Sequence, residues 1–173
     1  MREDGAVAKD DLRRRVERYL RAHHTMSIAT VGPGIPGPTG APTGNAAHAA
    51  SVFYAMDDAF RLVFLSKPTS LHGEHIGKAA PVAVTVSEDY QDWEKIQGVQ
   101  LWGEARLVTG AARVGAMALY VRRFPFVREL LQEPRLAELA RTIGVYRIEP
   151  RRAAFTDNTT GVFGREILEL VVE

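Results

Sequence analysis

The chain has 173 residues, a formal net charge of +1 at pH 7 and no cysteine. This length allows one domain to bury a sizeable core without metal ions or crosslinks. Because acidic and basic side chains nearly cancel, no overall field favours nucleic acid or an anionic membrane as a partner. The absence of cysteine rules out disulfides, thiolate metal ligands and a cysteine nucleophile, and it is compatible with a reducing cytoplasm.

The N-terminal segment is charged and lacks the apolar core of a signal peptide. No apolar run approaches the roughly 20 residues that a membrane-spanning helix needs. We therefore expect a single cytoplasmic domain over residues 1–173. Within residues 9–23, apolar side chains recur at helical spacing and predict an N-terminal helix, and we interpret its arginines as a solvated face rather than an RNA-binding run.

Apolar runs, alternating or continuous, predict strands along most of the chain. They lie at residues 25–31, 45–57, 59–67, 81–88, 96–110, 144–158 and 165–172. Asp57 and Asp58 form a tight acidic turn that favours a hairpin between two of these strands. Residues 32–44 are interrupted so often by proline and glycine that they predict a loop.

A helical pattern replaces the strands over residues 111–142, and it is broken at Phe124-Pro125 and at Pro134. The remaining strands follow one another in hairpin order, with one short helix between the third and the fourth. This order favours an antiparallel barrel over a parallel sheet. The sequence therefore predicts a mainly β (α+β) fold with peripheral helices.

Polar side chains gather where the third strand ends and the short helix begins. They are Ser66, Lys67, Thr69, Ser70 and His72. Thr69 and Ser70 are residue types that cap helices, and the first turn of a helix leaves backbone N–H groups without partners. With the charge of Lys67 and the imidazole of His72, these groups form a site where a phosphate would fit. The alternative interpretation is an ordinary capped helix with exposed polar residues.

Other candidate groups carry weaker signals. His72 and His75 share a helix face and could bind a metal together with His23, His24 or His48, but no carboxylate or cysteine stands at a helpful spacing, so we expect no metal site. On the long strand, Gln100 and Trp102 share a face with Gly98, where a planar ligand would lie close to the backbone. The alternative places Trp102 in the core and Gln100 at a sheet edge. Residues 155–167 are interpreted as a loop with capping side chains, and no catalytic triad is found.

Three short motifs point to a known family. They are "GVQLWGEARLV" (98–108), "YVRRFPFVR" (120–128) and "FTDNTTGVFG" (155–164). In order and approximate spacing they resemble the YhbP-like family within the pyridoxamine 5′-phosphate oxidase-related superfamily of FMN-binding split barrels. The superfamily pattern spans about residues 20–110. This resemblance implies an antiparallel split β-barrel.

The resemblance also implies where FMN is held. The phosphate maps onto the strand end and short helix, the ring lies along the preceding strand, and the long strand adds polar contacts. The implied cofactor-binding residues are Ala50, Ser51, Val52, Phe53, Ser66, Lys67, Ser70, Leu71, His72, Gln97 and Gln100. Family members are homodimers with flavin sites at the interface, so Asn158 and Arg165 are the expected contribution of a partner chain. His72 stands where many relatives carry lysine or arginine.

We therefore expect a homodimeric FMN-binding protein that acts as an oxidoreductase on a small-molecule electron donor or acceptor. No residue is assigned as catalytic, because a flavin passes electrons without a side-chain acid or base. Phe53, Val99 and Leu101 are expected to supply an apolar sheet face to the partner. Two further hypotheses stay open: a non-catalytic module that binds flavin or haem for storage or sensing, and a dimeric structural domain without a cofactor.

Overall fold

The computed structural model describes residues 2–34, 44–133, 138, 140, 142–161 and 164–170. Most of the predicted proline- and glycine-rich loop at residues 32–44 therefore lies outside the described residues. The helices are α1 (Arg2–Ala22), α2 (Leu71–Ile76), α3 (Gly110–Arg123) and α4 (Phe126–Gln132), with a 3-10 turn at Trp93–Lys95. The strands are β1 (Thr25–Pro33), β2 (Asn45–Met56), β3 (Leu62–Ser66), β4 (Ala79–Ser87), β5 (Gln97–Leu107), β6 (Gly144–Asp157) and β7 (Arg165–Glu169).

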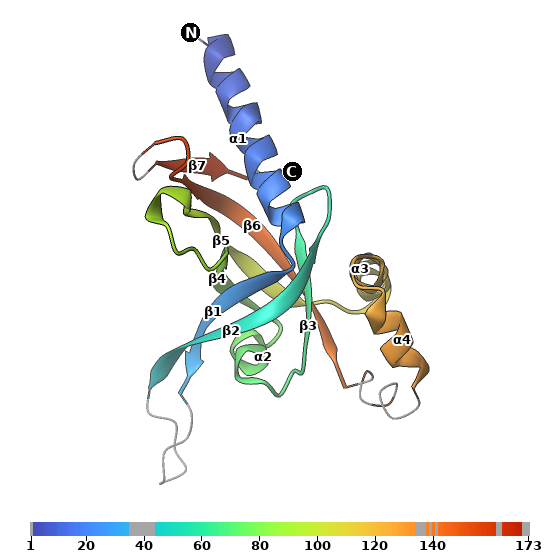
Figure 1. Ribbon diagram of the computed structural model, residues 1–173. Coiled ribbons are helices and arrows are strands. Elements are labelled where there is room, and N and C mark those ends of the chain that lie inside the picture. Colours follow the sequence, from blue (N-terminus) through green and yellow to red (C-terminus); the bar gives the residue numbers. More distant parts are fainter. Residues whose placement is uncertain are drawn as a thin grey trace.

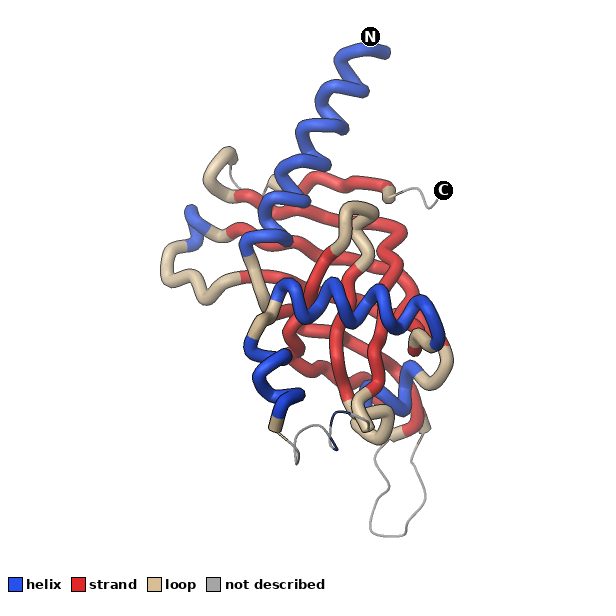
Figure 2. Tube along the Cα trace, turned by 90° about the vertical axis from the view of Figure 1, so that its right-hand side faces the viewer, coloured by secondary structure: helices blue, strands red, loops and turns tan. Residues whose placement is uncertain are grey.

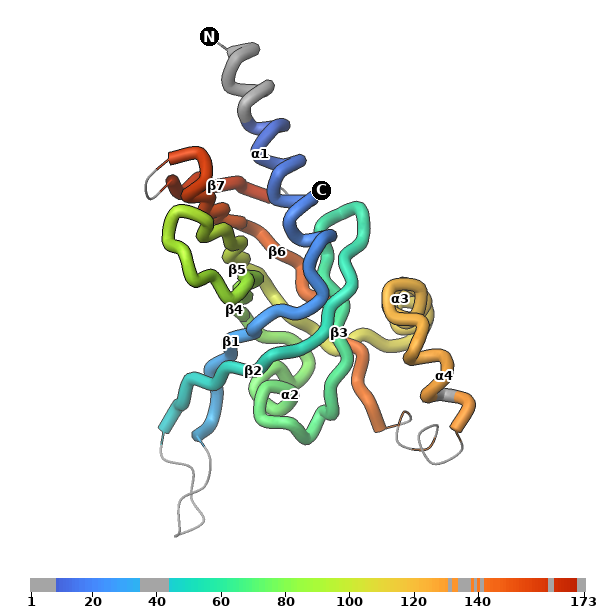
Figure 3. The backbone as a smooth tube through the Cα atoms, in the orientation of Figure 1, coloured from blue at the N-terminus to red at the C-terminus, as the bar shows by residue number. Residues whose placement is uncertain are grey.

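The strands form one antiparallel sheet that closes on itself. Its order is β3-β2-β1-β4-β5-β6-β7, and β3 also pairs with β6. Strand β6 makes the closure because its first half pairs with β3 and its second half with β7 (Figure 1). The predicted antiparallel barrel is thus observed, with β7 added beside the closed ring. The path from hairpin to hairpin can be followed in Figure 3.

The turn between β2 and β3 is longer than the predicted two-residue turn. The Asp57 carboxylate accepts hydrogen bonds from the backbone N–H groups of Ala59 and Arg61, each at 3.0 Å. Phe60 takes a positive φ of 61° and places its ring in the core. Strand β3 therefore begins at Leu62 rather than at residue 59, because the Asp57 side chain pairs with the backbone that the longer strand would have used.

The barrel interior holds the main core, to which β5 contributes Val99 and Leu101. Their side chains are 0% and 1% exposed. The expectation that these two residues face a partner chain is wrong, because the strand alternates and this half of it points inward. Phe53 is 47% exposed and does lie on the outside.

Helices cover the barrel at three places. α1 buries Val16 and Leu20 in the main core, and α2 packs against β1 near one end of the barrel. α3 crosses the outside of the sheet, where Ala116, Tyr120 and Phe124 form a second core with β2, β3 and β6 (Figure 2). Among the described residues, no helix combines the length and the apolar character that crossing a membrane requires.

Candidate functional site

The junction between β3 and α2 is built by tight backbone packing. Ser70 has extended backbone angles and caps α2, with its hydroxyl accepting from the backbone N–H of Gly73 at 3.2 Å. A Cβ at Gly73 would lie 2.5 Å from the carbonyl oxygen of Lys67 and 2.8 Å from that of Pro68. Only glycine lets the loop approach the helix this closely. The sequence prediction of a strand end followed by a capped helix is confirmed.

Ser66, Ser70 and His72 meet at this junction, and we call them the junction cluster. The Ser66 hydroxyl lies 3.0 Å from that of Ser70 and 2.6 Å from Nε2 of His72. The Ser70 hydroxyl proton is donated to the carbonyl oxygen of Lys67, at 2.7 Å. Ser66 must therefore donate to Ser70, and Nε2–H of His72 must donate to Ser66. The cluster is a chain of donors, and each of the two hydroxyl groups could turn to an anion in exchange for its present hydrogen bond.

His72 is buried, with 8% of its surface exposed, so the alternative that treats it as an exposed helix residue is wrong. Burial lowers its pKa below the usual value, and the neighbouring His48 and His75 lower it further when charged. In the chain alone, a neutral His72 is favoured. An incoming phosphate dianion would act in the opposite direction, because it stabilises the charged ring.

Two further histidines surround the cluster. The ring of His48, on β2, stacks on that of His72 with centroids 5.8 Å apart. His75 donates from Nε2 to the carbonyl oxygen of Pro33 at 3.0 Å, and its Nδ1 lies 3.1 Å from the Thr30 hydroxyl. These ring nitrogens point to different partners rather than to a common centre. Within the part of the chain that the structure describes, no group of three or more histidine and carboxylate side chains is arranged to hold a metal ion.

Strand β2 passes the junction cluster, as the stacking of His48 on His72 requires. Its predicted ring-binding residues divide between the two faces of the strand. Ala50 and Val52 are half-buried against the core, whereas Ser51 and Phe53 are exposed. Lys67 is exposed and Leu71 half-buried beside the cluster. The structure therefore brings the predicted β3 and α2 residues together beside β2 at His48, whereas the Phe53 ring contacts Phe124 and Phe126.

Gln97 and Gln100 lie far from the junction cluster within one chain. They are at the start of β5, whereas the junction lies beside its other end, where the N–H of Leu107 donates to the carbonyl oxygen of Lys78. Leu107 is seven steps along the strand from Gln100, which is roughly 23 Å. Within one chain the two glutamines therefore do not reach the junction cluster, and a shared site would need a second copy.

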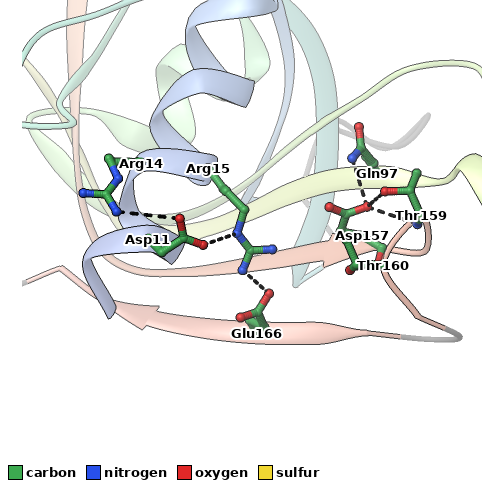
Figure 4. Close-up of polar contacts among 8 residues, drawn as sticks. All are labelled: Asp11, Arg14, Arg15, Gln97, Asp157, Thr159, Thr160 and Glu166. Carbon is green, nitrogen blue, oxygen red and sulfur yellow. Dashed lines mark hydrogen bonds and ion pairs between the residues drawn. The ribbon is translucent and has the colours of Figure 1, made fainter. Parts of the chain in front are cut away.

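The loop after β6 is organised around a buried carboxylate. Asp157 is 6% exposed and accepts from Nε2 of Gln97 at 2.9 Å and from the hydroxyl and N–H of Thr159 (Figure 4). Burial alone would raise the pKa of Asp157, but the hydrogen bonds from Thr159 and Gln97, with the charge of Arg15, hold it below its usual value. Arg15 also ties α1 to β7 through Glu166. The loop predicted over residues 155–167 is observed with its capping side chains only over residues 158–161, because residues 155–157 belong to β6 and residues 165–167 to β7, and residues 162 and 163 lie outside the described residues.

Asn158 and Arg165 flank this loop. The Asn158 amide donates to the carbonyl oxygen of Trp93 at 2.7 Å, and this bond holds the loop after β6 against the 3-10 turn. Arg165 donates to Oε1 of Gln100 at 2.8 Å, and its guanidinium lies 5.8 Å from the ring centre of Trp102. Trp102 is partly exposed on a central strand, so the alternative that placed it in the core, with Gln100 at an edge, is wrong.

A broad outer face of the sheet is not covered by any helix among the described residues, and we call it the open sheet face. It crosses β2, β1, β4 and β5 in register, as Ser51–Ser27–Thr85–Gln100 and Ala49–Ala29–Ala83–Trp102. These side chains are exposed or half-buried, and most are small. Small side chains on this face allow close approach of another surface.

Sequence comparison finds related proteins over most of the chain, although no family model matches. A UPF0306 protein from Klebsiella pneumoniae (strain ATCC 700721 / MGH 78578) is 35% identical over 119 residues, or 68% of this chain and 73% of that protein. The UPF0306 protein YhbP of Salmonella newport is 34% identical over the same shares.

Solved structures share the fold at low sequence identity. A candidate pyridoxamine 5′-phosphate oxidase from Listeria innocua aligns with a TM-score of 0.56 at 14% identity, covering 83% of this chain and 97% of its own. An FAD-binding protein from Mesorhizobium loti gives 0.54 at 18% identity, over 80% and 89% of the two chains. The haem storage protein HutZ from Vibrio cholerae gives 0.58 at 13% identity, over 79% and 87%. These likenesses confirm the predicted split-barrel fold.

Proposed function

The chain belongs to the UPF0306 family, which includes the YhbP proteins, and on this basis we propose that it is an FMN-binding oxidoreductase that works as a homodimer. The family membership confirms the resemblance found in the three sequence motifs. The observation that carries the proposal is the junction cluster, where two rotatable hydroxyl groups and a buried imidazole meet beside β2. Flavin binding by a protein of the same fold supports it.

The donor set fits a phosphate. The hydroxyl groups of Ser66 and Ser70 donate to protein oxygens and would turn to a phosphate in exchange for those bonds, and His72 has a proton on Nε2. Lys67 is exposed next to them and adds a charge on a flexible stem. In this assignment the three cluster side chains hold the phosphate, and Lys67 neutralises it.

A bound flavin would itself supply the hydride or electron transfer. The chain would orient the ring along β2, where Ser51 lies on the exposed side and Ala50 on the half-buried side. No described side chain is needed as an acid or base for such a transfer, and none is assigned that role.

A second copy would complete the site. The open sheet face carries small side chains over four strands and has Phe53 at its border. We propose that two copies pack through this face. Gln97, Gln100 and Arg165, which do not reach the junction in their own chain, would then serve the site of the partner, with Asn158 supporting their loop.

The second candidate function is haem storage or sensing, and His48 is the observation that favours it. Among the described residues, His48 makes ring contacts with His72 and His75 but no hydrogen bond through its own ring nitrogens. A neutral imidazole nitrogen is a ligand for haem iron. The haem storage protein HutZ has the same fold.

Visible absorption of the purified protein after addition of FMN or haemin separates these functions. Flavin bands retained through gel filtration would support the leading proposal, and a Soret band retained instead would support the second. Ser70→Asp places a negative charge against the phosphate and should abolish FMN retention. Ser70→Asn is the matched control, because asparagine caps a helix as aspartate does but carries no charge. Equal FMN affinity in a folded Ser70→Asp variant would remove the junction from the site.

A further inference from the structure

A groove lies on the other side of the junction, between α3 and the ends of β5 and β6, and we call it the α3 groove. Its volume is about 600 Å³, within the range of small-molecule sites. Pro68, Leu107, Val108, Thr109, Arg113, Met117, Ala140, Thr142, Ile143 and Gly144 line it. None of these residues belongs to the junction cluster.

The groove begins at the strand end that carries the cluster. Gly144 lines the groove and is the direct partner of Ser66 in the β3–β6 pairing. A Cβ at Gly144 would lie 3.0 Å from the Leu107 side chain and 3.3 Å from the carbonyl oxygen of Ser66. Pro68, from the loop between Ser66 and Ser70, forms one wall. The cluster and the groove therefore lie at the same strand end.

The lining is suited to a nucleotide. Leu107, Val108, Met117 and Ile143 give apolar surface for a flat heterocycle. Arg113 donates to the carbonyl oxygen of Ile143 at 3.3 Å and has no carboxylate partner among the described residues, so its charge is available to a phosphate. Thr109 precedes α3 without donating or accepting a capping bond through its side chain. Because Thr109 also lines the groove, its hydroxyl is a candidate partner for a sugar.

We propose that the α3 groove binds the nucleotide half of flavin adenine dinucleotide, so that the chain holds the dinucleotide more tightly than FMN. The inference rests on the proposed flavin site, because the junction cluster places the first phosphate. Arg113 binds the second phosphate, and the adenine ring lies on Met117 and the apolar floor. The groove then determines which flavin the protein selects.

Calorimetric titration of the dimeric protein with FMN and with FAD tests this assignment. FAD should bind at least tenfold more tightly than FMN. Met117→Trp fills the groove and Arg113→Gln removes the charge, so each should bring FAD affinity down to that of FMN while leaving FMN unchanged. Val114→Trp is the matched control, because Val114 is on the same helix and is 71% exposed outside the groove. It should change neither affinity.

The outcomes separate the two claims. FMN binding with no gain for FAD overturns the groove assignment and leaves the proposed flavin site in place. A gain for FAD that survives both Met117→Trp and Arg113→Gln also overturns it. Failure of both flavins to bind overturns the proposed function together with the groove. Adenosine 5′-monophosphate titrated alone gives an independent readout: heat of binding that disappears in Arg113→Gln supports the groove.

Discussion

The pKa of His72 should be lowered in the free protein and raised when an anion binds. In the chain alone, burial lowers the pKa of His72. A phosphate dianion at about 3 Å, the contact distance of a charge-assisted hydrogen bond, would raise that pKa. Binding would then take up a proton. The affinity for FMN should fall as pH rises from the lowered value of the free protein to the raised value of the complex.

The test compares the wild-type protein with His72→Lys between about pH 6 and pH 9. A charge-assisted contact of about 1.5–3 kcal/mol corresponds to a roughly tenfold to hundredfold fall in affinity for the wild type. The lysine variant keeps its charge, so it should show only the opposite trend from the second ionisation of the phosphate near pH 6. Identical pH profiles for the two proteins would mean that His72 does not contact the phosphate.

Asp157 should contribute to stability in a pH-dependent way. Its pKa is lowered in the folded chain, so the contribution is present above the unfolded value near 4 and is lost as pH falls through the lowered value. Asp157→Asn should reduce the free energy of unfolding by about 1–3 kcal/mol at pH 7, because it disturbs the hydrogen bonds from Gln97 and Thr159. Urea denaturation at several pH values measures this.

The control for this variant is Asp58→Asn. Asp58 forms an exposed ion pair with Arg21, and such pairs add little to stability. The difference between Asp157→Asn and the wild type should shrink below about pH 4. A difference that stays constant over the whole pH range would show that the carboxylate charge is not what stabilises the loop.

The junction cluster could be predicted from sequence because its members are close in the chain. Ser66, Ser70 and His72 surround one strand-to-helix turn, so local geometry alone brings them together. His48 could not be found this way. Its place against His72 depends on the pairing of β1 with β2, in which His48 lies opposite Thr30.

At the scale of elements, Gly73 should decide whether α2 can carry the site. Gly73→Ala places a Cβ within 2.8 Å of two backbone oxygens, so the loop at Lys67 and Pro68 must move away from the helix. Overpacking of this kind costs about 1–3 kcal/mol. The variant should lose both stability and FMN affinity, measured by thermal unfolding and by titration.

Gly115→Ala is the matched control on α3, where an added Cβ meets nothing within 4 Å. Alanine is the better helix former, so this variant should gain up to about 1 kcal/mol. The prediction for Gly73 fails if its alanine variant unfolds at the wild-type temperature and binds FMN equally well.

The strands could be predicted from the alternation of apolar and polar residues. Which face of a strand points into the barrel could not be predicted in this way. In β5 the pattern marks Val99 and Leu101 as one face and Gln100 and Trp102 as the other. Only the closure of the barrel shows that the apolar pair points inward. The sequence predicts a strand from residue 59, but β3 begins at Leu62 because the Asp57 side chain accepts hydrogen bonds from the backbone of Ala59 and Arg61.

At the scale of the whole molecule, no described helix covers the open sheet face, and the proposed dimer accounts for this exposure. Ala29 and Ala49 lie side by side near its centre. An arginine at position 49 would have to bury an unpaired charge in the interface, which costs several kcal/mol, or more than about a hundredfold in the dimer dissociation constant. Sedimentation at micromolar concentration should therefore show a dimer for the wild type and a folded monomer for Ala49→Arg.

The loss of the partner should also weaken FMN binding, because the second copy supplies Gln97, Gln100 and Arg165 in the proposed site. Ala111→Arg is the matched control, since Ala111 is exposed on α3, away from the open sheet face. It should remain a dimer with wild-type affinity. A wild-type protein that sediments as a monomer with FMN bound would contradict the dimer and the interface location of the site. The closed barrel holds β1 and β2 together whether or not a partner is present, so Ala49→Arg should fold. If this variant is still a dimer, the interface lies on another surface.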